Sequence, residues 1–250
     1  MALTKKLKCF WTLGLCLVVS KLSKLVKVPY VPTIYDPGFI HECVDRHNEM
    51  RGKVTPSAAN MQYLHWDKDL ARLAKSWTRK CKYSHNPCTA KRYSCTVDFD
   101  FIGENMYLGP INSTPKEVIS LWYSEGKYYN FDDMTCSKIC GNYTQVVWAK
   151  TFKVGCAVSN CPNLLGRSAA LFVCNYAPAG NEKNTNPYKK GEFCSMCKAE
   201  DCVSNLCSIY FNESHYVTIG LEMLIGANEV ISGYTIKGSD SSLPETTNRR

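Results

Sequence analysis

The chain has 250 residues, of which 45% are hydrophobic and 21% are charged, and its formal net charge is +8. This composition is sufficient for a normal hydrophobic core and contains too few charges for a generally disordered protein. No basic run is interleaved with aromatic residues, so we expect no nucleic-acid surface. The positive charge favours contact with acidic cell surfaces, although scattered Lys and Arg also serve simply as a solvated face.

The first residues have the pattern of a secretory signal. Lys5, Lys6 and Lys8 precede an apolar run over residues 9–19, and Ser20 follows as a small residue. A charged start, a short apolar run and a small residue are typical of a cleaved signal peptide, and the run is too short to anchor the chain in a bilayer. We therefore predict a signal peptide over residues 1–20, whose removal lowers the net charge to +5.

The fifteen cysteines favour disulfides, because a secreted chain passes through an oxidising compartment. Removal of Cys9 and Cys16 with the signal leaves an odd number, so at least one thiol is free or pairs with another molecule. A late cluster over residues 194–207 also allows a zinc site. The oxidising route favours two disulfides in this cluster instead. Its members are Cys194, Cys197, Cys202 and Cys207.

The first half of the chain reads as three helices. Apolar residues recur at helical spacing over residues 37–51, with Gly52 as a stop, and again over residues 66–82. A third helix begins at Thr114, where Pro115 and a glutamate three residues after the cap complete a capping box. We expect its buried side to consist of Val118, Leu121 and Trp122.

The second half reads as strands. Apolar residues alternate over residues 152–161 and return over residues 169–176, and a loop rich in Gly, Asn and Pro joins the two runs as a hairpin. The segment 140–150, "CGNYTQVVWAK", also reads as a strand with Asn142 at its head. Helices followed by strands predict an α+β domain in which helices cover a mostly antiparallel sheet.

The end of the chain is polar. Residues 178–187 have the composition of a linker, and the mildly apolar stretch 216–234 is interrupted by Glu222 and Glu229, so we expect no transmembrane segment. The terminus is not hydrophobic, as a glycolipid-anchor signal would require. We expect a flexible polar tail over residues 208–250.

Six motifs in order resemble the CAP superfamily of cysteine-rich secretory, antigen and pathogenesis-related proteins. They are "HNEMRGKV", "NMQYLHWDKDLARLAKSW", "FIGENMYLG", "YTQVVWAK", "KVGCAVSNCPN" and "FVCNYAPAGN". Within the superfamily the chain is similar to the mammalian glioma pathogenesis-related branch. The resemblance implies a three-layer α-β-α sandwich with an open cleft over residues 36–180. A linker and a small cysteine-rich knot follow over residues 181–207.

The resemblance also implies a cleft site of two histidines and two glutamates, and in some members the histidines hold a divalent metal. Carried over by motif, the positions are His85, Glu104, Glu125 and Asn142, which we call the tetrad. Asn142 stands where the second histidine is expected. An amide is a poor ligand for zinc, so only His85 remains as a nitrogen ligand and we expect no cofactor. A catalytic base at Glu104 or Glu125 is the alternative to a structural role.

The resemblance further implies disulfides that join Cys156 to Cys174 and Cys81 to Cys161. Three N-x-S/T sequons are candidate glycan sites: Asn112, Asn142 and Asn212. A site that heads a strand inside a cleft suits a glycan poorly, so Asn112 and Asn212 are favoured over Asn142.

Hydrolase signatures such as G-x-S-x-G and H-E-x-x-H are absent from the sequence. We therefore predict no catalytic residues and a secreted recognition module that binds an extracellular protein or glycan. The resemblance implies a setting on sperm or in the male reproductive tract. A lipid or sterol carrier is the second hypothesis, and a metal-dependent hydrolase is the third.

Overall fold

The computed structural model describes residues 30–197 and 201–208. The predicted signal peptide, Asn212 and the predicted tail beyond Ser208 lie outside the described residues. Within the described ranges no helix is long and apolar enough to cross a membrane. The helices are α2 (Pro37–Arg51), α3 (Lys68–Thr78), α4 (Pro115–Ser124) and α5 (Gly141–Val146), with 3-10 turns η1 (Pro87–Ala90) and η2 (Glu125–Tyr128).

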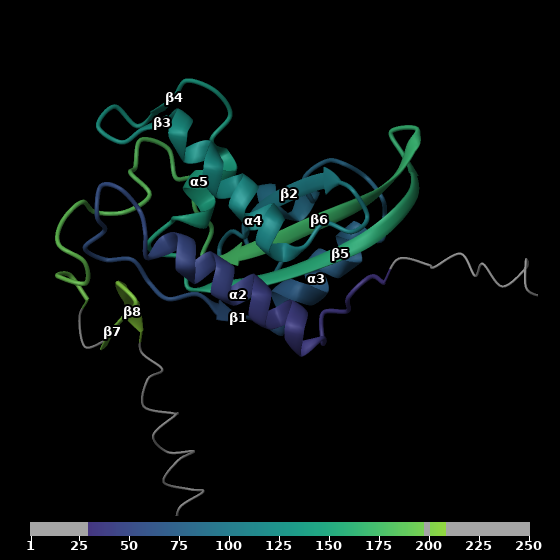
Figure 1. Ribbon diagram of the computed structural model, residues 1–250, viewed down its shortest axis with the longest axis horizontal. Helices are drawn as coiled ribbons and strands as arrows, with labels where there is room; N and C mark the ends of the chain where they lie inside the picture. The colour runs from purple at the N-terminus through teal and green to yellow at the C-terminus, as the bar shows by residue number, and fades with distance from the viewer. Residues whose placement is uncertain (1–29, 198–200, 209–250) are drawn as a thin grey trace, which may run out of the picture.

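The fold is an α-β-α sandwich around a four-stranded sheet in the order β1-β5-β6-β2, as Figure 1 shows. This confirms the predicted α+β class. Strand β1 runs parallel to β5, and the other neighbours are antiparallel. The strands are β1 (His65–Trp66), β2 (Gly103–Gly109), β3 (Tyr129–Asn130), β4 (Thr135–Cys136), β5 (Lys153–Leu164), β6 (Arg167–Ala177), β7 (Asp201–Val203) and β8 (Leu206–Ser208).

The predicted hairpin is confirmed as β5 and β6. Both strands are buried along most of their length, which their near-continuous apolar runs explain. The strands extend further than the sequence suggested, because only Leu165 and Gly166 form the turn. Both turn residues have positive φ, at 54° and 79°, which is the geometry of a tight two-residue hairpin loop.

Helix α3 covers one face of the sheet. Its apolar stripe of Ala71, Ala74 and Trp77 packs on the hairpin in one hydrophobic cluster. Gly155 of β5 permits this close approach, since a Cβ there would lie 2.2 Å from the backbone nitrogen of Ala71. The helix begins later than predicted because Asp67 caps it by accepting the N–H groups of Asp69 and Leu70, the second and third residues of the helix.

Helices α2 and α4 cover the opposite face of the sheet. The capping box of Thr114 and Glu117 forms as predicted at the start of α4. The prediction that Leu121 is buried was wrong: its side chain is 52% exposed, and Ile119 is buried with Val118 and Trp122 instead.

The segment 140–150 is not the predicted strand. Residues Gly141–Val146 form α5, in which Thr144 and Val147 donate their N–H groups to carbonyls four residues earlier. The two valines and the alternating pattern favoured a strand locally. Tertiary contacts from Glu125 and Gln145 stabilise the helical turn instead.

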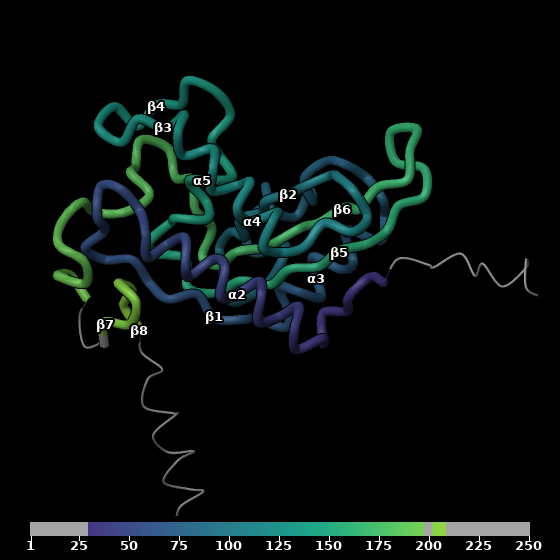
Figure 2. Tube along the Cα trace, viewed as in Figure 1, coloured from purple at the N-terminus to yellow at the C-terminus, as the bar shows by residue number. Residues whose placement is uncertain are grey.

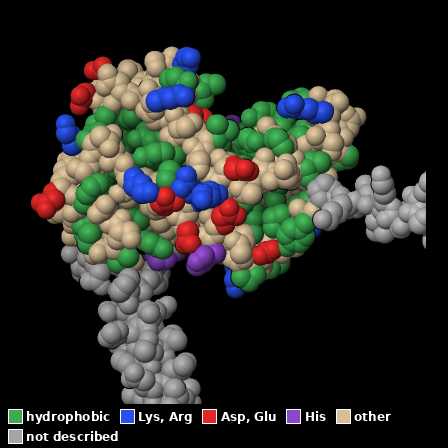
Figure 3. Space-filling view, in the orientation of Figure 1, with side chains coloured by type: hydrophobic (Ala, Val, Ile, Leu, Met, Phe, Trp, Pro, Cys, Tyr) green, Lys and Arg blue, Asp and Glu red, His purple; other side chains and the backbone are tan. Residues whose placement is uncertain are grey.

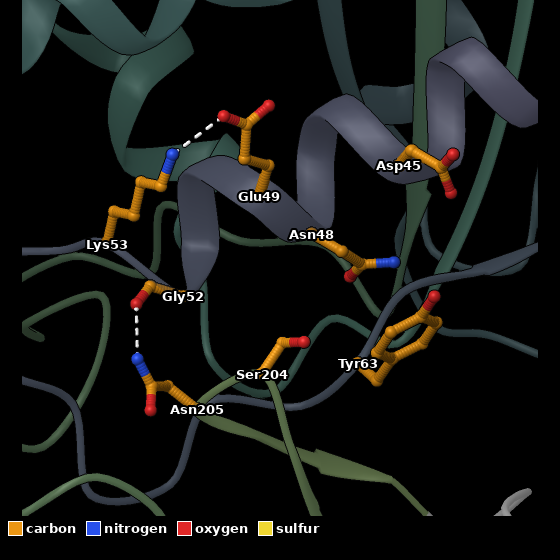
Figure 4. A pocket seen from close by; sticks show the side chains of 8 residues that line it. All are labelled: Asp45, Asn48, Glu49, Gly52, Lys53, Tyr63, Ser204 and Asn205. Carbon is orange, nitrogen blue, oxygen red and sulfur yellow. Dashed lines mark hydrogen bonds and ion pairs between the residues drawn. The ribbon is translucent and has the colours of Figure 1, made fainter.

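The cysteine-rich knot packs closely against the sandwich. Cys207 exchanges backbone hydrogen bonds with Met61 and Tyr63, and Met196 donates to the carbonyl of Ala59. The tube in Figure 2 shows the knot beside the segment of residues 59–63. Figure 4 shows where the tip of the knot meets the end of α2, around a polar cavity of about 410 Å³. There Asn205 donates to the carbonyl of Gly52 at 3.0 Å.

A buried arginine joins α2 to the segments that follow it. Arg51 is fully buried and donates hydrogen bonds only to backbone carbonyls. No carboxylate pairs with its charge among the described residues. The accepting carbonyls belong to Gln62, Val146, Trp148, Ala149 and Thr151.

Candidate functional site

The first half of the tetrad is an ion pair between a strand and a loop. Glu104 lies in β2 with a side chain only 1% exposed, and His85 lies in the loop after α3 with a side chain 65% exposed. The Glu104 Oε1 accepts hydrogen bonds from the ring Nδ1 of His85 and from the backbone N–H of Asn86, both at 2.9 Å. The hydrogen bond to Glu104 raises the pKa of His85 against the opposing effect of desolvation. The contact uses Nδ1 alone and fixes the orientation of the ring.

The second half of the tetrad is formed by Glu125 and Asn142. The Oε2 of Glu125 accepts the backbone N–H groups of Asn142 and Tyr143, at 3.0 and 3.2 Å. Its Oε1 accepts the side-chain amide of Asn142 at 2.8 Å. The Glu125 carboxylate thus supplies the cap that the start of α5 otherwise lacks, since Cys140 makes no side-chain cap.

Asn105 joins the strand that carries Glu104 to α5. It donates from its amide to the carbonyl of Asn142 at 3.0 Å and to the hydroxyl of Tyr176 at 3.3 Å. Among the described residues, no hydrogen bond or ion pair links the His85–Glu104 pair to the side chains of Glu125 and Asn142. The tetrad is two separate pairs whose supporting backbone is connected.

A second contact fixes α5 against β2. The side chain of Gln145 lies over Gly103, where a Cβ would come within 2.0 Å of the Gln145 Oε1. That oxygen accepts the N–H of Gly180 at 2.9 Å, and the amide nitrogen donates to Thr151 at 3.3 Å. The two motifs "GEN" and "YTQ" therefore depend on each other. Sequence reasoning quoted both motifs but assigned no role to Gly103, Asn105 or Gln145.

The surface is hollowed near these elements. Figure 3 shows a depression between the part of the molecule that carries α5, β3 and β4 and the tip of the β5–β6 hairpin. A cavity of about 550 Å³ is lined by the loops at residues 98–101 and 178–182, and no tetrad residue lines it.

The donor set does not fit a divalent metal. Asn142 stands at the position of the second imidazole, and its amide nitrogen donates to Glu125, so His85 is the one nitrogen ligand that the tetrad offers. Over residues 30–197 and 201–208, no group of three or more His, Cys, Asp or Glu side chains is arranged to hold a metal ion. We derive no step through a metal here.

Two further histidines, His47 and His65, lie away from the tetrad. His47 is fully buried in α2 and its ring nitrogens contact the carbonyl of Cys43 and the hydroxyl of Tyr176, both at 2.8 Å. Burial lowers the pKa of His47 to about 4. His65 is half-buried in β1 beside the ring of Tyr63.

Six disulfides form among the described residues. They include Cys81–Cys161 and Cys156–Cys174, the pairs that the resemblance implied, and two that close the knot. Cys43 is free and buried, and burial raises its pKa well above the usual value. The knot pairs are Cys194–Cys202 and Cys197–Cys207, and the remaining two are Cys88–Cys95 and Cys136–Cys140.

Two of the sequons can be placed. Asn112 is exposed in the loop before α4, on the rim of a cavity of about 340 Å³. Asn142 is only half-exposed, and its amide nitrogen, the atom a glycan would modify, donates to Glu125.

Comparisons with known proteins agree with this fold. The family described as CAP, the cysteine-rich secretory protein family, matches residues 44–176. GLIPR1-like protein 1 of Mus musculus is 58% identical over 209 residues, which cover 83% of this chain and 89% of that protein. Glioma pathogenesis-related protein 1 of Mus musculus is 46% identical over 179 residues, which cover 71% of this chain and 67% of that protein.

Among solved structures, BmVAL-1 aligns with a TM-score of 0.56 and 27% identity, covering 69% of this chain and 94% of that one. The family and the six disulfides fit an extracellular protein. The motif order, the sandwich and these similarities lead to one conclusion: the chain belongs to the CAP family and is a relative of the glioma pathogenesis-related proteins.

Proposed function

We propose that this chain is a secreted, non-enzymatic recognition module that binds a protein or glycan on cell surfaces, in the sperm or male reproductive setting that the family resemblance implies. One observation carries the proposal. The Glu125 carboxylate accepts three hydrogen bonds and the Glu104 Oε1 accepts two, so these oxygens stabilise the structure around the tetrad. The Glu104 Oε2 is buried and has no hydrogen-bond partner among the described residues. With one imidazole, the tetrad lacks the second nitrogen ligand that metal chemistry would need.

A zinc titration by calorimetry tests the non-enzymatic part of the proposal. The secreted, deglycosylated protein is titrated beside an Asn142→His variant. We expect no binding by the wild type and measurable binding by the variant, because the second imidazole restores a nitrogen ligand. Zinc binding by the wild type in the micromolar range or tighter, lost on His85→Ala, would instead favour the metal-dependent hydrolase.

The recognition part is tested on cells. Fluorescently labelled protein is applied to sperm and to erythrocytes, in the presence of excess unlabelled protein or of an unrelated secreted protein. We expect saturable binding to sperm that only the unlabelled protein competes. Non-saturable binding of equal strength on both cell types would contradict recognition.

A lipid or sterol carrier is the second candidate. It is favoured by the cavity of about 340 Å³ between residues 30–39 and the loop before α4. Much of its wall is apolar and comes from Val31, Phe39, Ile111 and Val158. Mass spectrometry of organic extracts from purified protein distinguishes the two functions, since a carrier retains a stoichiometric apolar ligand and a recognition module does not.

A further inference from the structure

One segment of the described residues carries positive charge without acidic side chains. Between Asp69 and Asp98 the sequence contains seven Lys and Arg residues and no Asp or Glu. The other such stretch, residues 1–28 with six lysines, lies almost wholly within and beside the predicted signal peptide. The seven are Arg72, Lys75, Arg79, Lys80, Lys82, Lys91 and Arg92, and all but Lys75 are exposed.

The face that carries α2 and α4 is different. In Figure 3, Lys and Arg side chains on that face lie among Asp and Glu side chains. Several of them form ion pairs, such as Arg46 and Lys53 with Glu49. Positive charge there is neutralised locally. On the α3 side Arg72 and Arg92 also form ion pairs, whereas Arg79, Lys80 and Lys82 form none among the described residues.

Three cations of α3 line a single cavity of about 380 Å³. Arg72, Lys75 and Arg79 share one side of the helix at spacings of three and four residues, together with Ser76. The opposite wall is the segment of Thr33, Ile34 and Tyr35, and the ring of Tyr35 is 60% exposed. Hydroxyl groups and a flat aromatic surface thus lie beside the cations.

The cations of this cavity differ in how far they are already paired. Lys75 donates to the carbonyl of Val158 and the hydroxyl of Ser159, so it is partly committed to the fold. Arg72 hydrogen-bonds to the Tyr35 side chain and pairs with Asp69. The guanidinium of Arg79 has no hydrogen bond or ion pair among the described residues. Repulsion between Arg79 and Lys75 adds to the burial that lowers the pKa of Lys75.

The macrodipole of α3 explains part of this arrangement, because cations near the C-terminal end stabilise a helix. It does not explain Arg72 in the first half of the helix, nor the continuation of the charge through Lys80 and Lys82 beyond it. Lys80 lies over the ring of Trp77, at 4.7 Å from the ring centroid, which holds one of these charges at the surface. The run of positive charge therefore continues along the chain past the end of the helix.

We propose that the α3 face, defined by Arg72, Lys75, Arg79, Lys80 and Lys82, binds a sulfated polysaccharide of the cell surface. Arg79 and Arg72 contact sulfate groups at the cavity, and Tyr35, Thr33 and Ser76 contact sugar rings and hydroxyls. An extended, flexible polyanion fits a row of cations, and it releases counterions on binding. This proposal deepens the recognition function and rests on it, since it names a sulfated glycan as the partner.

The test uses the full secreted protein and a heparin octasaccharide in calorimetry at several salt concentrations. The variant Arg72→Gln/Arg79→Gln removes two exposed charges without touching Lys75. The control Lys183→Gln/Lys190→Gln removes two charges from exposed lysines elsewhere. We expect the first variant to bind about tenfold more weakly, with a shallower dependence of affinity on salt, and the control to remain within about twofold of the wild type.

Three outcomes would overturn the proposal. Equal weakening by both variants would mean that total charge decides binding. Undiminished binding to desulfated heparin would exclude sulfate as the recognised group. Tighter binding to phosphatidylserine vesicles than to heparin, lost in the first variant, would assign the face to membranes. Zinc binding by the wild type contradicts the non-enzymatic function but leaves a heparin result at Arg72 and Arg79 intact, so the two failures can be distinguished.

Discussion

Glu125 holds Asn142 at two points, through the backbone N–H at 3.0 Å and through the side-chain amide at 2.8 Å. The C-cap residue of α4 therefore caps α5, and Asn142 replaces the expected imidazole by a donor that suits a carboxylate. This relationship explains why an asparagine at the family's second histidine position is compatible with an ordered site.

The Glu125→Ala variant tests this capping role. Loss of the carboxylate leaves three donors at the start of α5 without acceptors, so we expect the free energy of unfolding to fall by about 2 kcal/mol. Urea denaturation followed by fluorescence measures the change. The exposed Glu192→Ala control should change it by less than about 0.5 kcal/mol. A loss no greater than in the control would mean that Glu125 does not stabilise α5.

Acid should destabilise the protein through His47. Burial lowers the pKa of His47 to about 4 in the native state, and the unfolded chain keeps about 6.5. The unfolded state therefore binds a proton that the native state rejects as the pH falls from 6.5 to 4. The free energy of unfolding decreases across this window by about 3 kcal/mol from this group alone.

Urea midpoints at pH 7, 5.5 and 4.5 measure this effect in the wild type and in His47→Gln. The variant should be less stable at pH 7 but should lose less stability on acidification. The control His41→Gln changes an exposed histidine, and its stability should depend on pH as that of the wild type does. Parallel pH profiles for wild type and His47→Gln would contradict a neutral buried imidazole.

Arg51 should be among the residues most sensitive to substitution. An Arg51→Met variant leaves the carbonyls of five residues buried without this donor, so we expect a loss of at least about 3 kcal/mol in the free energy of unfolding. Arg51→Lys should recover part of it, because an ammonium offers fewer donors with a different geometry. Thermal unfolding compares the two Arg51 variants with Arg167→Met, a control that replaces an exposed arginine. Equal stability of Arg51→Met and that control would exclude the proposed role.

Glycan occupancy should differ between two sequons. We expect Asn112 to carry a glycan when the protein is secreted from mammalian cells, because its loop is exposed. Asn142 should remain unmodified, since its amide donates to Glu125. Peptide mapping after enzymatic deglycosylation in heavy-oxygen water reports both sites in one experiment. Substantial occupancy at Asn142 would show that the Glu125 contact is dispensable.

Patterns with a strong local cause were predictable from the sequence. The capping box at Thr114 formed because its three components lie within four residues, and the β5–β6 hairpin formed because two long apolar runs flank a short turn. The family resemblance supplied the tetrad positions. Local periodicity alone would not have selected His85 or Glu104, which are nineteen positions apart.

Features that depend on distant contacts were not predictable. The segment after Cys140 has strand-like residues, but Glu125 caps it and Gln145 anchors it over Gly103. Burial of Arg51 has no sequence signal either, because its acceptors are backbone carbonyls contributed by residues 62–151. Burial of the free thiol at Cys43 likewise depends on packing. The odd number of cysteines predicted only that at least one thiol is free or pairs with another molecule.

The docking of the knot changes where the folding unit ends. A chain truncated after Ala177 would keep every tetrad residue and the whole four-stranded sheet, yet it would lose the partners of Ala59, Met61 and Tyr63. Gly52 lies so close to the backbone of Ser204 that a Cβ there would come within 2.5 Å of its carbonyl oxygen. Proteolysis between sandwich and knot would therefore expose apolar surface on both fragments. Any shortened version intended for binding studies should extend to Ser208.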